Sequence, residues 1–263
     1  MPVAMTVAGS DSGGGAGVQA DLKTFAALGV YGASALTAIT AQNTVAVTAV
    51  HELPIDLIAA QIEAVVSDIG VDAVKTGMLS SSEIVEVVAR ELDRHGIKNL
   101  VVDPVMIAKS GDPLLRQEAV DSVRTLLVPL ACIVTPNVPE AETLTGMKVE
   151  TDEDMREAAR RIIGMGARAV VVKGGHREGP ATDLFYDGTE FVEFTSDRFD
   201  TVNTHGTGCT FASATAAGLA QGKSVVEAVA QAKEYVTEAI RNSYPLGQGH
   251  GPVHHFWQLW DKS

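Results

Sequence analysis

Short runs of apolar residues alternate along the chain with longer stretches in which apolar residues recur at helical spacing. The short runs predict strands at Ala4–Ala8, Gly32–Thr40, Ala73–Thr76, Asn99–Asp103, Cys132–Thr135 and Ala169–Lys173. The helical spacing predicts helices over Pro54–Ile69 and Ser82–His95 and around residues 155–163. Because strand and helix alternate strictly, we expect parallel strands joined by right-handed crossovers, which is an α/β fold.

The last third of the chain departs from this alternation. Residues 183–194 form two alternating runs around Asp187-Gly188, which predicts a hairpin at an antiparallel edge of the sheet. Two long helices are predicted next, over Gly208–Ala220 and Ser224–Asn242, and then a loop with a short closing helix within Gly247–Ser263. No repeat or linker interrupts the sequence, so residues 1–263 are expected to form a single domain.

The composition suits this fold and narrows the function. Apolar residues make up 46% of the 263 positions and aromatic residues only 5%, so the core must consist mainly of aliphatic side chains. The net charge of −13, without any basic run, argues against a nucleic-acid partner. It also means that a phosphate site would need local positive potential from a lysine, a metal ion or backbone N–H groups.

The sequence lacks the features of secreted and membrane proteins. Two cysteines, Cys132 and Cys209, do not suggest a disulfide framework. The N-terminus begins with an apolar strand and shows no basic region or cleavage site. No apolar run approaches the roughly 20 residues of a membrane span. We therefore expect a reduced, cytoplasmic protein with no membrane partner.

Polar or glycine-rich segments follow the predicted strands. They are Gly9–Gly17, Gln42-Asn43, Thr76-Gly77-Met78, Asp103-Pro104-Val105, Thr135-Pro136-Asn137 and Lys173-Gly174-Gly175. The carboxyl ends of parallel strands meet at one edge of a sheet, where open α/β folds bind their ligands. We therefore expect these segments to line one site.

The segment NTHGTGC, residues 203–209, is the strongest candidate for chemistry. Gly206 and Gly208 flank Thr207 and allow a sharp turn close to a ligand, and the helix predicted to begin at about Gly208 offers an anion site. Such a site can stabilise a phosphoryl group during transfer. The alternative is an ordinary glycine-rich helix start.

Cys209 lies in the first turn of that helix. There the helix dipole lowers a thiol pKa, so a thiolate could accept the proton of an attacking hydroxyl. The alternative is a small thiol packed beneath the helix. Cys132, within an apolar run, is expected to be such a core residue.

The glycine-rich segment Gly9–Gly17 matches neither a P-loop nor a dinucleotide fingerprint. Its Ser10, Asp11 and Ser12, with Asp21 on the next helix, better suit recognition of a polar small molecule. Asp21 could equally be a solvated helix residue.

Three further residues could serve a metal ion or a phosphate. Glu140 follows Asn137 at a helix start and could hold Mg²⁺ through waters, although an acidic first turn, favoured by the dipole, explains at least one of Glu140 and Glu142. Asp103 precedes a proline at a strand end and is harder to explain as a cap. Lys173 could meet a phosphate or could snorkel to solvent. The histidines show no metal-binding pattern.

Taken together, these motifs resemble the hydroxymethylpyrimidine/phosphomethylpyrimidine kinases of thiamine biosynthesis, within the ribokinase-like superfamily. The resemblance rests on GSDSGGGAGVQADLKTFAALGVYG, AQNT, VKTGML, VVDPVM, TPNVPEAE, VVKGGH and HGTGCTFASA, in this order. It extends to about Gly251, and the ending GQGHGPVHHF fits as well. The GTGC motif separates this group from the sugar kinases of the superfamily, which carry an aspartate where Cys209 stands.

The resemblance implies a ribokinase-like three-layer sandwich, with a mostly parallel central sheet and helices on both faces. It implies an enzyme, typically a homodimer, that uses ATP and Mg²⁺. The substrates would be 4-amino-5-hydroxymethyl-2-methylpyrimidine and then its monophosphate, which is converted to the diphosphate.

The resemblance also implies roles for particular residues. Cys209 would be the base, and Gly206, Thr207 and Gly208 would form the anion hole. Gln42, Gly9, Asp21, Met78 and Val105 would bind the pyrimidine. Lys173, Asn137 and Thr207 would contact ATP, and Asp103 and Glu140 would help to hold Mg²⁺. An amide such as Gln42 suits a pyrimidine, since it both donates and accepts hydrogen bonds.

Two rival functions remain open at this point. A pyridoxine or pyridoxal kinase would share the fold and mechanism, because its substrate is a similar hydroxymethyl pyridine. A non-catalytic pyrimidine-binding protein would need neither Cys209 nor Lys173. A nicotinamide dehydrogenase would need a fingerprint that the sequence lacks.

Overall fold

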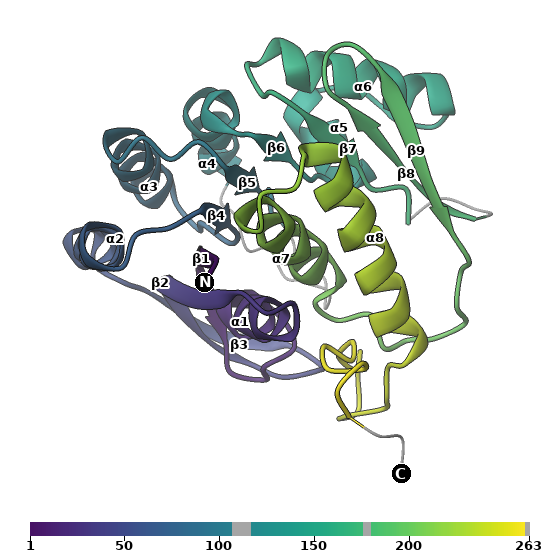
Figure 1. The fold of residues 1–263 in the computed structure, drawn as a ribbon, viewed down its shortest axis with the longest axis horizontal. Coiled ribbons are helices and arrows are strands. Elements are labelled where there is room, and N and C mark those ends of the chain that lie inside the picture. The colour runs from purple at the N-terminus through teal and green to yellow at the C-terminus, as the bar shows by residue number, and fades with distance from the viewer. Residues whose placement is uncertain (107–116, 176–179, 261–263) are drawn as a thin grey trace.

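One nine-stranded sheet organises the computed structural model, which describes residues 1–106, 117–175 and 180–260. The strand order is β3-β2-β1-β4-β5-β6-β7-β8-β9 (Figure 1). The strands are β1 (Val3–Asp11), β2 (Tyr31–Gln42), β3 (Val47–Glu52), β4 (Ala73–Thr76), β5 (Leu100–Val102), β6 (Ile133–Val134), β7 (Val170–Val172), β8 (Ala181–Tyr186) and β9 (Phe191–Ser196).

The central strands, from β2 through β1 and β4 to β7, pair in parallel, while β3 at one edge and β8 and β9 at the other pair antiparallel. Six carboxyl ends therefore share one edge of the sheet, as the sequence predicted. This edge is where the cavity described below opens.

Helices cover both faces of the sheet (Figure 1). One face carries α1 (Gly17–Ala27), α7 (Thr207–Ala220) and α8 (Val225–Arg241). The other carries α2 (Ile55–Asp68), α3 (Ser82–Arg94), α4 (Gln117–Ser122), α5 (Val138–Thr145) and α6 (Asp152–Gly164). A π-helical turn (Val123–Leu127) and a 3-10 turn (Val128–Leu130) follow α4. The expected α/β three-layer architecture is confirmed.

Local sequence explains where several helices begin. Thr151 with Asp154, and Ser224 with Glu227, form capping boxes at the starts of α6 and α8. In each box the cap side chain accepts an amide hydrogen bond that the helix itself cannot satisfy. Helix α7 begins without such a side-chain cap, at a glycine, which leaves its first amides available to a ligand.

The sheet separates two apolar cores. One lies beneath α2 to α6 and is rich in Val, Leu and Ile, and the other lies beneath α1, α7 and α8. Helix α7 is buried along most of its length, and its alanines allow it to lie close to the strands. Cys132 is 3% exposed in this second core, which confirms the prediction for that residue. No described helix is long and apolar enough to cross a membrane.

Two elements differ from the sequence prediction. Strand β3 was not predicted, because nearly all of its side chains are exposed and no alternation of apolar and polar residues marks it. The prediction of a closing helix in the tail is wrong for the residues that the structure describes, since residues 255–259 form turns; His254 and His255 are buried there. The last three residues of the tail, 261–263, lie outside the described residues. The hairpin around Asp187-Gly188 is confirmed as β8 and β9.

Candidate active site

A cavity of about 790 Å³ opens along the shared carboxyl edge of the strands. It joins the ends of β1, β2, β4, β5, β6 and β7 to the start of α7. All the site residues expected from the sequence line it except Asp21: Gly9, Gln42, Met78, Val105, Asp103, Asn137, Glu140, Lys173, Gly206, Thr207, Gly208 and Cys209. Segments far apart in the chain thus form one site.

The turn before α7 is shaped by close backbone contact. Gly206, the N-cap of α7, has a φ of 81°, and a Cβ there would lie 1.8 Å from the carbonyl oxygen of Gly15. Only glycine can satisfy both the left-handed conformation and this contact. The amides of Gly208 and Cys209 belong to the first turn, whose N–H groups have no partner within the helix. The turn can therefore receive an anion.

Asp11 and His205 tie the glycine-rich first loop to this turn. Asp11 accepts hydrogen bonds from the backbone N–H groups of Gly13, Gly15 and Ala16, and its Oδ2 lies 2.9 Å from His205 Nε2. Burial alone would raise the pKa of Asp11, but the hydrogen bonds from His205 and the backbone lower it below its usual value. The sequence alone gives His205 no role.

The end of the cavity nearest β1 and β2 combines an amide with apolar side chains. Gln42 ends β2, and its backbone N–H donates to Ser12 Oγ (2.8 Å). Met78 packs on Gly9 so closely that a Cβ on Gly9 would lie 2.3 Å from the methionine methyl group. Val105 completes the wall. This end can receive a flat ring with polar substituents.

The opposite wall carries an ion pair between Lys173 and Asp103. Lys173 Nζ lies 3.2 Å from Asp103 Oδ1, which also accepts a hydrogen bond from Thr135 (3.1 Å). Asp103 Oδ2 is buried and has no hydrogen-bond partner among the described residues. Burial alone would lower the pKa of Lys173, but the carboxylates of Asp103 and Glu140 raise it. Lys173 is therefore cationic, and a free carboxylate oxygen lies beside it.

Glu140 is both a helix cap and part of this wall. It forms a capping box with Asn137, in which Glu140 Oε2 accepts from the Asn137 N–H (2.8 Å). The alternative offered by the sequence, an acidic residue in the first turn of a helix, is confirmed for Glu140, which nevertheless lines the cavity. Burial, together with the charge of Asp103, raises the pKa of Glu140 to about 7.

The expectation for the Cys209 thiol is wrong in its direction. Burial raises the pKa of Cys209 to about 11, and the charges of Asp21 and Asp103 act in the same direction. The charge of Lys75 and a hydrogen bond from the Gly17 amide lower the pKa without overcoming burial. The helix dipole favours a thiolate, but removal of water from a thiolate costs more here.

Comparison with known proteins shows the family of this chain. Residues 11–254 match the phosphomethylpyrimidine kinase family. The chain belongs to this family. It is 51% identical to the hydroxymethylpyrimidine/phosphomethylpyrimidine kinase of Bacillus subtilis over 96% of this chain and 94% of that protein. It is 56% identical over 95% of its length to the thiamine biosynthesis bifunctional protein ThiED of Geobacter sulfurreducens, and the match spans about half (51%) of that longer protein.

Solved structures of related kinases confirm the ribokinase-like fold of this phosphomethylpyrimidine kinase family member. An ADP complex of Bacillus subtilis pyridoxal kinase superposes with a TM-score of 0.92 at 44% identity, covering 98% of this chain and 99% of that one. The phosphomethylpyrimidine kinase of Clostridium difficile superposes with a TM-score of 0.83 at 47% identity, covering 91% and 100%.

Asp21 does not line the cavity, so that expectation is wrong. Its carboxylate is 0% exposed and is bound by Lys75 Nζ (2.9 and 3.0 Å), Thr6 Oγ1 (2.6 Å) and Ser213 Oγ (2.5 Å). Lys75, which the sequence analysis overlooked, lies between this carboxylate and the cavity that it lines. A lysine inside the short apolar strand Ala73–Thr76, directly before Gly77, was the available signal.

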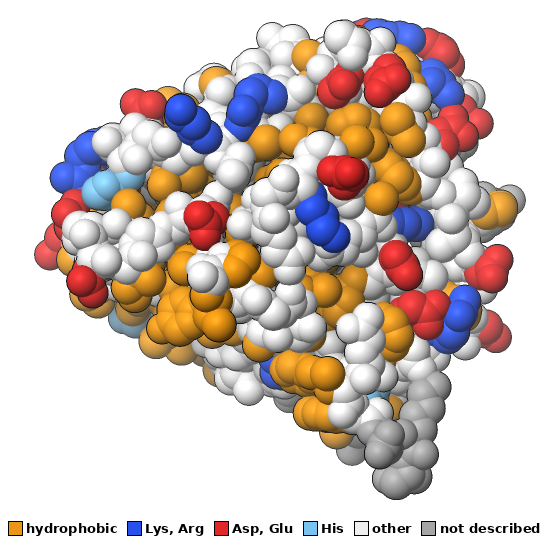
Figure 2. Space-filling model, in the orientation of Figure 1, with side chains coloured by type: hydrophobic (Ala, Val, Ile, Leu, Met, Phe, Trp, Pro, Cys, Tyr) orange, Lys and Arg blue, Asp and Glu red, His pale blue; other side chains and the backbone are white. Residues whose placement is uncertain are grey.

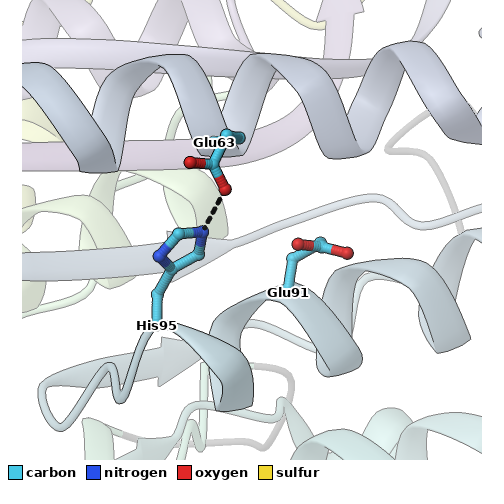
Figure 3. Close-up of side chains that lie close together, drawn as sticks. All are labelled: Glu63, Glu91 and His95. Carbon is cyan, nitrogen blue, oxygen red and sulfur yellow. Dashed lines mark ion pairs between the residues drawn. The ribbon is translucent and has the colours of Figure 1, made fainter.

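A second group of polar side chains lies between α2 and α3, away from the cavity (Figure 3). Ligand atoms of Glu63, Glu91 and His95 lie within 4.8 Å of one another. Arg94 forms ion pairs with both carboxylates, and His95 Nε2 lies 3.2 Å from Glu63. Arg90 also pairs with Glu91, so two arginines balance the two carboxylates, and these contacts serve to join α2 to α3.

Proposed function

We propose that this chain is an ATP-dependent kinase that phosphorylates 4-amino-5-hydroxymethyl-2-methylpyrimidine and then its monophosphate. The observation that carries the proposal is the cavity itself, in which Gln42 and the turn at residues 206–209 face one space. The family match and the names of the relatives from Bacillus subtilis and Geobacter sulfurreducens support the same chemistry.

In the proposed reaction, Gln42 hydrogen-bonds the pyrimidine, and Gly9, Met78 and Val105 hold its ring. The hydroxymethyl oxygen attacks the γ-phosphorus of ATP as the bond from phosphorus to the ADP oxygen breaks, and ADP leaves with that electron pair. Cys209, in its thiolate form, takes the proton of the attacking hydroxyl.

Other residues balance the charge that moves in this step. The amides at Gly206, Thr207 and Gly208 receive the migrating phosphoryl group. Lys173 meets the phosphates of ATP, which Asn137 and Thr207 also contact. The chain has 33 Asp and Glu residues but only 20 Lys and Arg residues. A nucleotide therefore needs this local positive charge in order to bind.

Asp103 and Glu140 suit a magnesium ion. Asp103 Oδ2 is a buried oxygen without a described partner, and hard oxygen ligands are what Mg²⁺ prefers. When bound, the ion would neutralise charge on the ATP phosphates. Thr135 and Lys173 fix the other oxygen of Asp103, so the free oxygen is held in one orientation.

The acceptor preference separates this proposal from a pyridoxal or pyridoxine kinase. We expect kcat/KM for the pyrimidine alcohol to exceed that for pyridoxal and pyridoxine by at least about 100-fold, because a site built to hydrogen-bond one ring leaves buried groups unpaired with another. A coupled assay of ADP release with the three alcohols and the pyrimidine monophosphate measures this. A Cys209→Ala variant should lose most of kcat and keep the KM of the pyrimidine.

Each outcome of that assay has a definite meaning. A preference for pyridoxal would show that the proposed substrate is wrong, but the assignment of kinase activity would stand. Turnover of the alcohol without turnover of the monophosphate would remove the second step. Substrate binding without ADP release would favour a non-catalytic pyrimidine-binding protein.

We also infer a homodimer with a cytoplasmic location, built from one domain over residues 1–263. The edge strand β3 and its neighbours expose Ile39, Val50, Ile55 and Leu57, which a second subunit could cover. A catalytic thiol must stay reduced, which supports the cytoplasm. Small molecules are the expected partners, since Lys and Arg are interspersed with Asp and Glu on the face in Figure 2 and the net charge is −13.

A further inference from the structure

The most deeply buried charges near the cavity are those of Lys75 and Asp21. Both side chains are 0% exposed, and Lys75 Nζ bonds both oxygens of the carboxylate (3.0 and 2.9 Å). Thr6 of β1 and Ser213 of α7 donate further hydrogen bonds to Asp21. The pair therefore joins β1, α1, β4 and α7 at one point.

This point lies directly beneath the catalytic turn. Ser213, which anchors Asp21, is one helical turn after Cys209 on α7, so the two side chains share a face of the helix. Lys75 and Cys209 both line the cavity. A Cβ on Gly77 would lie 2.8 Å from Lys75 Nζ, so that glycine leaves room for the ammonium group at the end of its strand.

The ammonium group has one proton more than its partner uses. Two N–H groups of Lys75 point to the two oxygens of Asp21, and the described residues offer no hydrogen bond to the third. Thr6 and Ser213 also donate hydrogen bonds to the oxygens of the Asp21 carboxylate. The positive end of the pair thus faces the cavity, and the negative end is solvated by hydroxyl groups.

Stability alone is a poor reason to keep such a pair. Removing two charges from water costs about as much as their attraction returns, and apolar side chains of similar volume often replace a buried pair without loss. A fully buried pair at the edge of an active site therefore indicates that its charge has a function in the site.

We propose that Lys75 is a positioning residue that holds a fixed positive charge against Cys209 and stabilises its thiolate before the hydroxyl proton arrives. This role rests on the proposed kinase function. In the step itself, the proton passes from the acceptor hydroxyl to the Cys209 sulfur, and the attacking oxygen forms its bond to phosphorus. Lys75 keeps its own proton throughout.

The groups that face Cys209 give the expected direction of the effect. They are Lys75 on β4, Lys173 after β7, Asp21 on α1, Asp103 after β5 and the Gly17 amide. Burial raises the pKa of the thiol to about 11, and among the charges Lys75 acts most strongly, lowering it. Removal of Lys75 should therefore raise the thiol pKa further and reduce the thiolate fraction at every pH below it.

The test is the alkylation rate of Cys209 by iodoacetamide between pH 7 and 10. It uses a Cys132→Ala background, so that Cys209 is the one cysteine left in the chain, and a Cys209→Ala variant supplies the blank. Lys75→Met is compared with Lys75→Met/Asp21→Asn, which removes both charges together and avoids an unpaired buried carboxylate. Lys98→Met, at an exposed position, is the matched control.

We expect alkylation to slow at least about threefold in Lys75→Met, and by a smaller factor in Lys75→Met/Asp21→Asn, because the double variant also loses the Asp21 charge that raises the thiol pKa. Each unit of pKa increase lowers the thiolate fraction tenfold, but the more basic thiolate is roughly threefold more nucleophilic. Lys98→Met should leave the rate unchanged. Under the proposal, kcat at pH 7.5 also falls in both variants, while the KM of ATP stays the same.

An alkylation rate that does not fall when Lys75 is replaced would overturn the proposal. If Lys75 only holds the fold together, its removal loosens the site and exposes the thiol, and alkylation becomes faster or stays equal while the thermal melting temperature falls. The kinase proposal fails by a separate result, namely no phosphorylation of the pyrimidine by the parent protein. The alkylation rates need no turnover, so the two failures are distinguishable.

Discussion

Two of the lysine–aspartate pairs in or beside the cavity, Lys75–Asp21 and Lys173–Asp103, differ in how completely the carboxylate is bound. In the closed pair, Lys75–Asp21, both oxygens of the aspartate have partners and neither side chain is exposed. In the open pair, Lys173–Asp103, one carboxylate oxygen has no described partner and the lysine side chain is 14% exposed. Both pairs consist of a lysine and an aspartate, but the groups around the two carboxylates differ.

The difference shows how one pair of residue types can serve two purposes. A carboxylate with every lone pair occupied has nothing left to offer a ligand, so it can only fix the position of its partner. A carboxylate held on one side keeps its orientation and still has an oxygen for a cation. The open pair suits ATP and magnesium, and the closed pair suits a charge that must not move.

Breaking the closed pair should have the largest effect on stability. Lys75→Met leaves the Asp21 carboxylate buried and unpaired, which should lower the free energy of unfolding by about 3–5 kcal/mol. Lys75→Met/Asp21→Asn should recover a large part of that loss, because no uncompensated charge remains. Equilibrium unfolding in urea, followed by circular dichroism, measures both variants.

The open pair provides the matched control for this prediction. Lys173→Met should cost only about 1–2 kcal/mol of unfolding free energy, because Thr135 still donates to Asp103 and cavity water can enter the space that the lysine leaves. Equal losses in Lys75→Met and Lys173→Met would show that the two pairs do not differ in the way the geometry suggests.

Breaking the open pair should instead affect catalysis. Lys173→Met removes the cation that we propose meets the ATP phosphates, so kcat should fall by about 100-fold or more, a typical loss for one donor to a developing charge. The KM of the pyrimidine should change little, since Gln42 lies at the other end of the cavity. Steady-state kinetics at saturating ATP decides this. A large increase in the KM of the pyrimidine with unchanged kcat would show that Lys173 serves pyrimidine binding and not the phosphates.

The two pairs also mark the limit of what the sequence could predict. Both residues of the open pair, though not their contact, were expected in the site, because each follows a strand and parallel strand ends converge at one edge. The same rule placed Gln42 and Met78 correctly in the cavity. The central strands were predicted because buried parallel strands appear as continuous apolar runs, whereas the exposed edge strand β3 carries no such pattern.

The closed pair was missed because it depends on tertiary structure. Asp21 and Lys75 are 54 residues apart, and although each lies within a motif of the family resemblance, nothing in either motif indicates that the two side chains meet. An aspartate on a helix next to a glycine-rich loop suggested a ligand contact, and only the packing of α1 against β4 and α7 shows that it is covered. The direction of the Cys209 pKa failed for the same reason, since the helix dipole is visible in a sequence and burial is not.

The smallest effect expected is a pH dependence confined to the open pair. Glu140, with a pKa raised to about 7 by burial, must lose its proton to assist a cation. Affinity for Mn²⁺, a spin probe for the magnesium site, should therefore rise about tenfold per pH unit below 7 and level off above it. In Glu140→Gln the affinity should be weak at every pH and nearly flat between pH 6 and 8. Electron paramagnetic resonance titrations measure both proteins, and a wild-type affinity that is flat over this range would remove Glu140 from the metal site while leaving Asp103 in it.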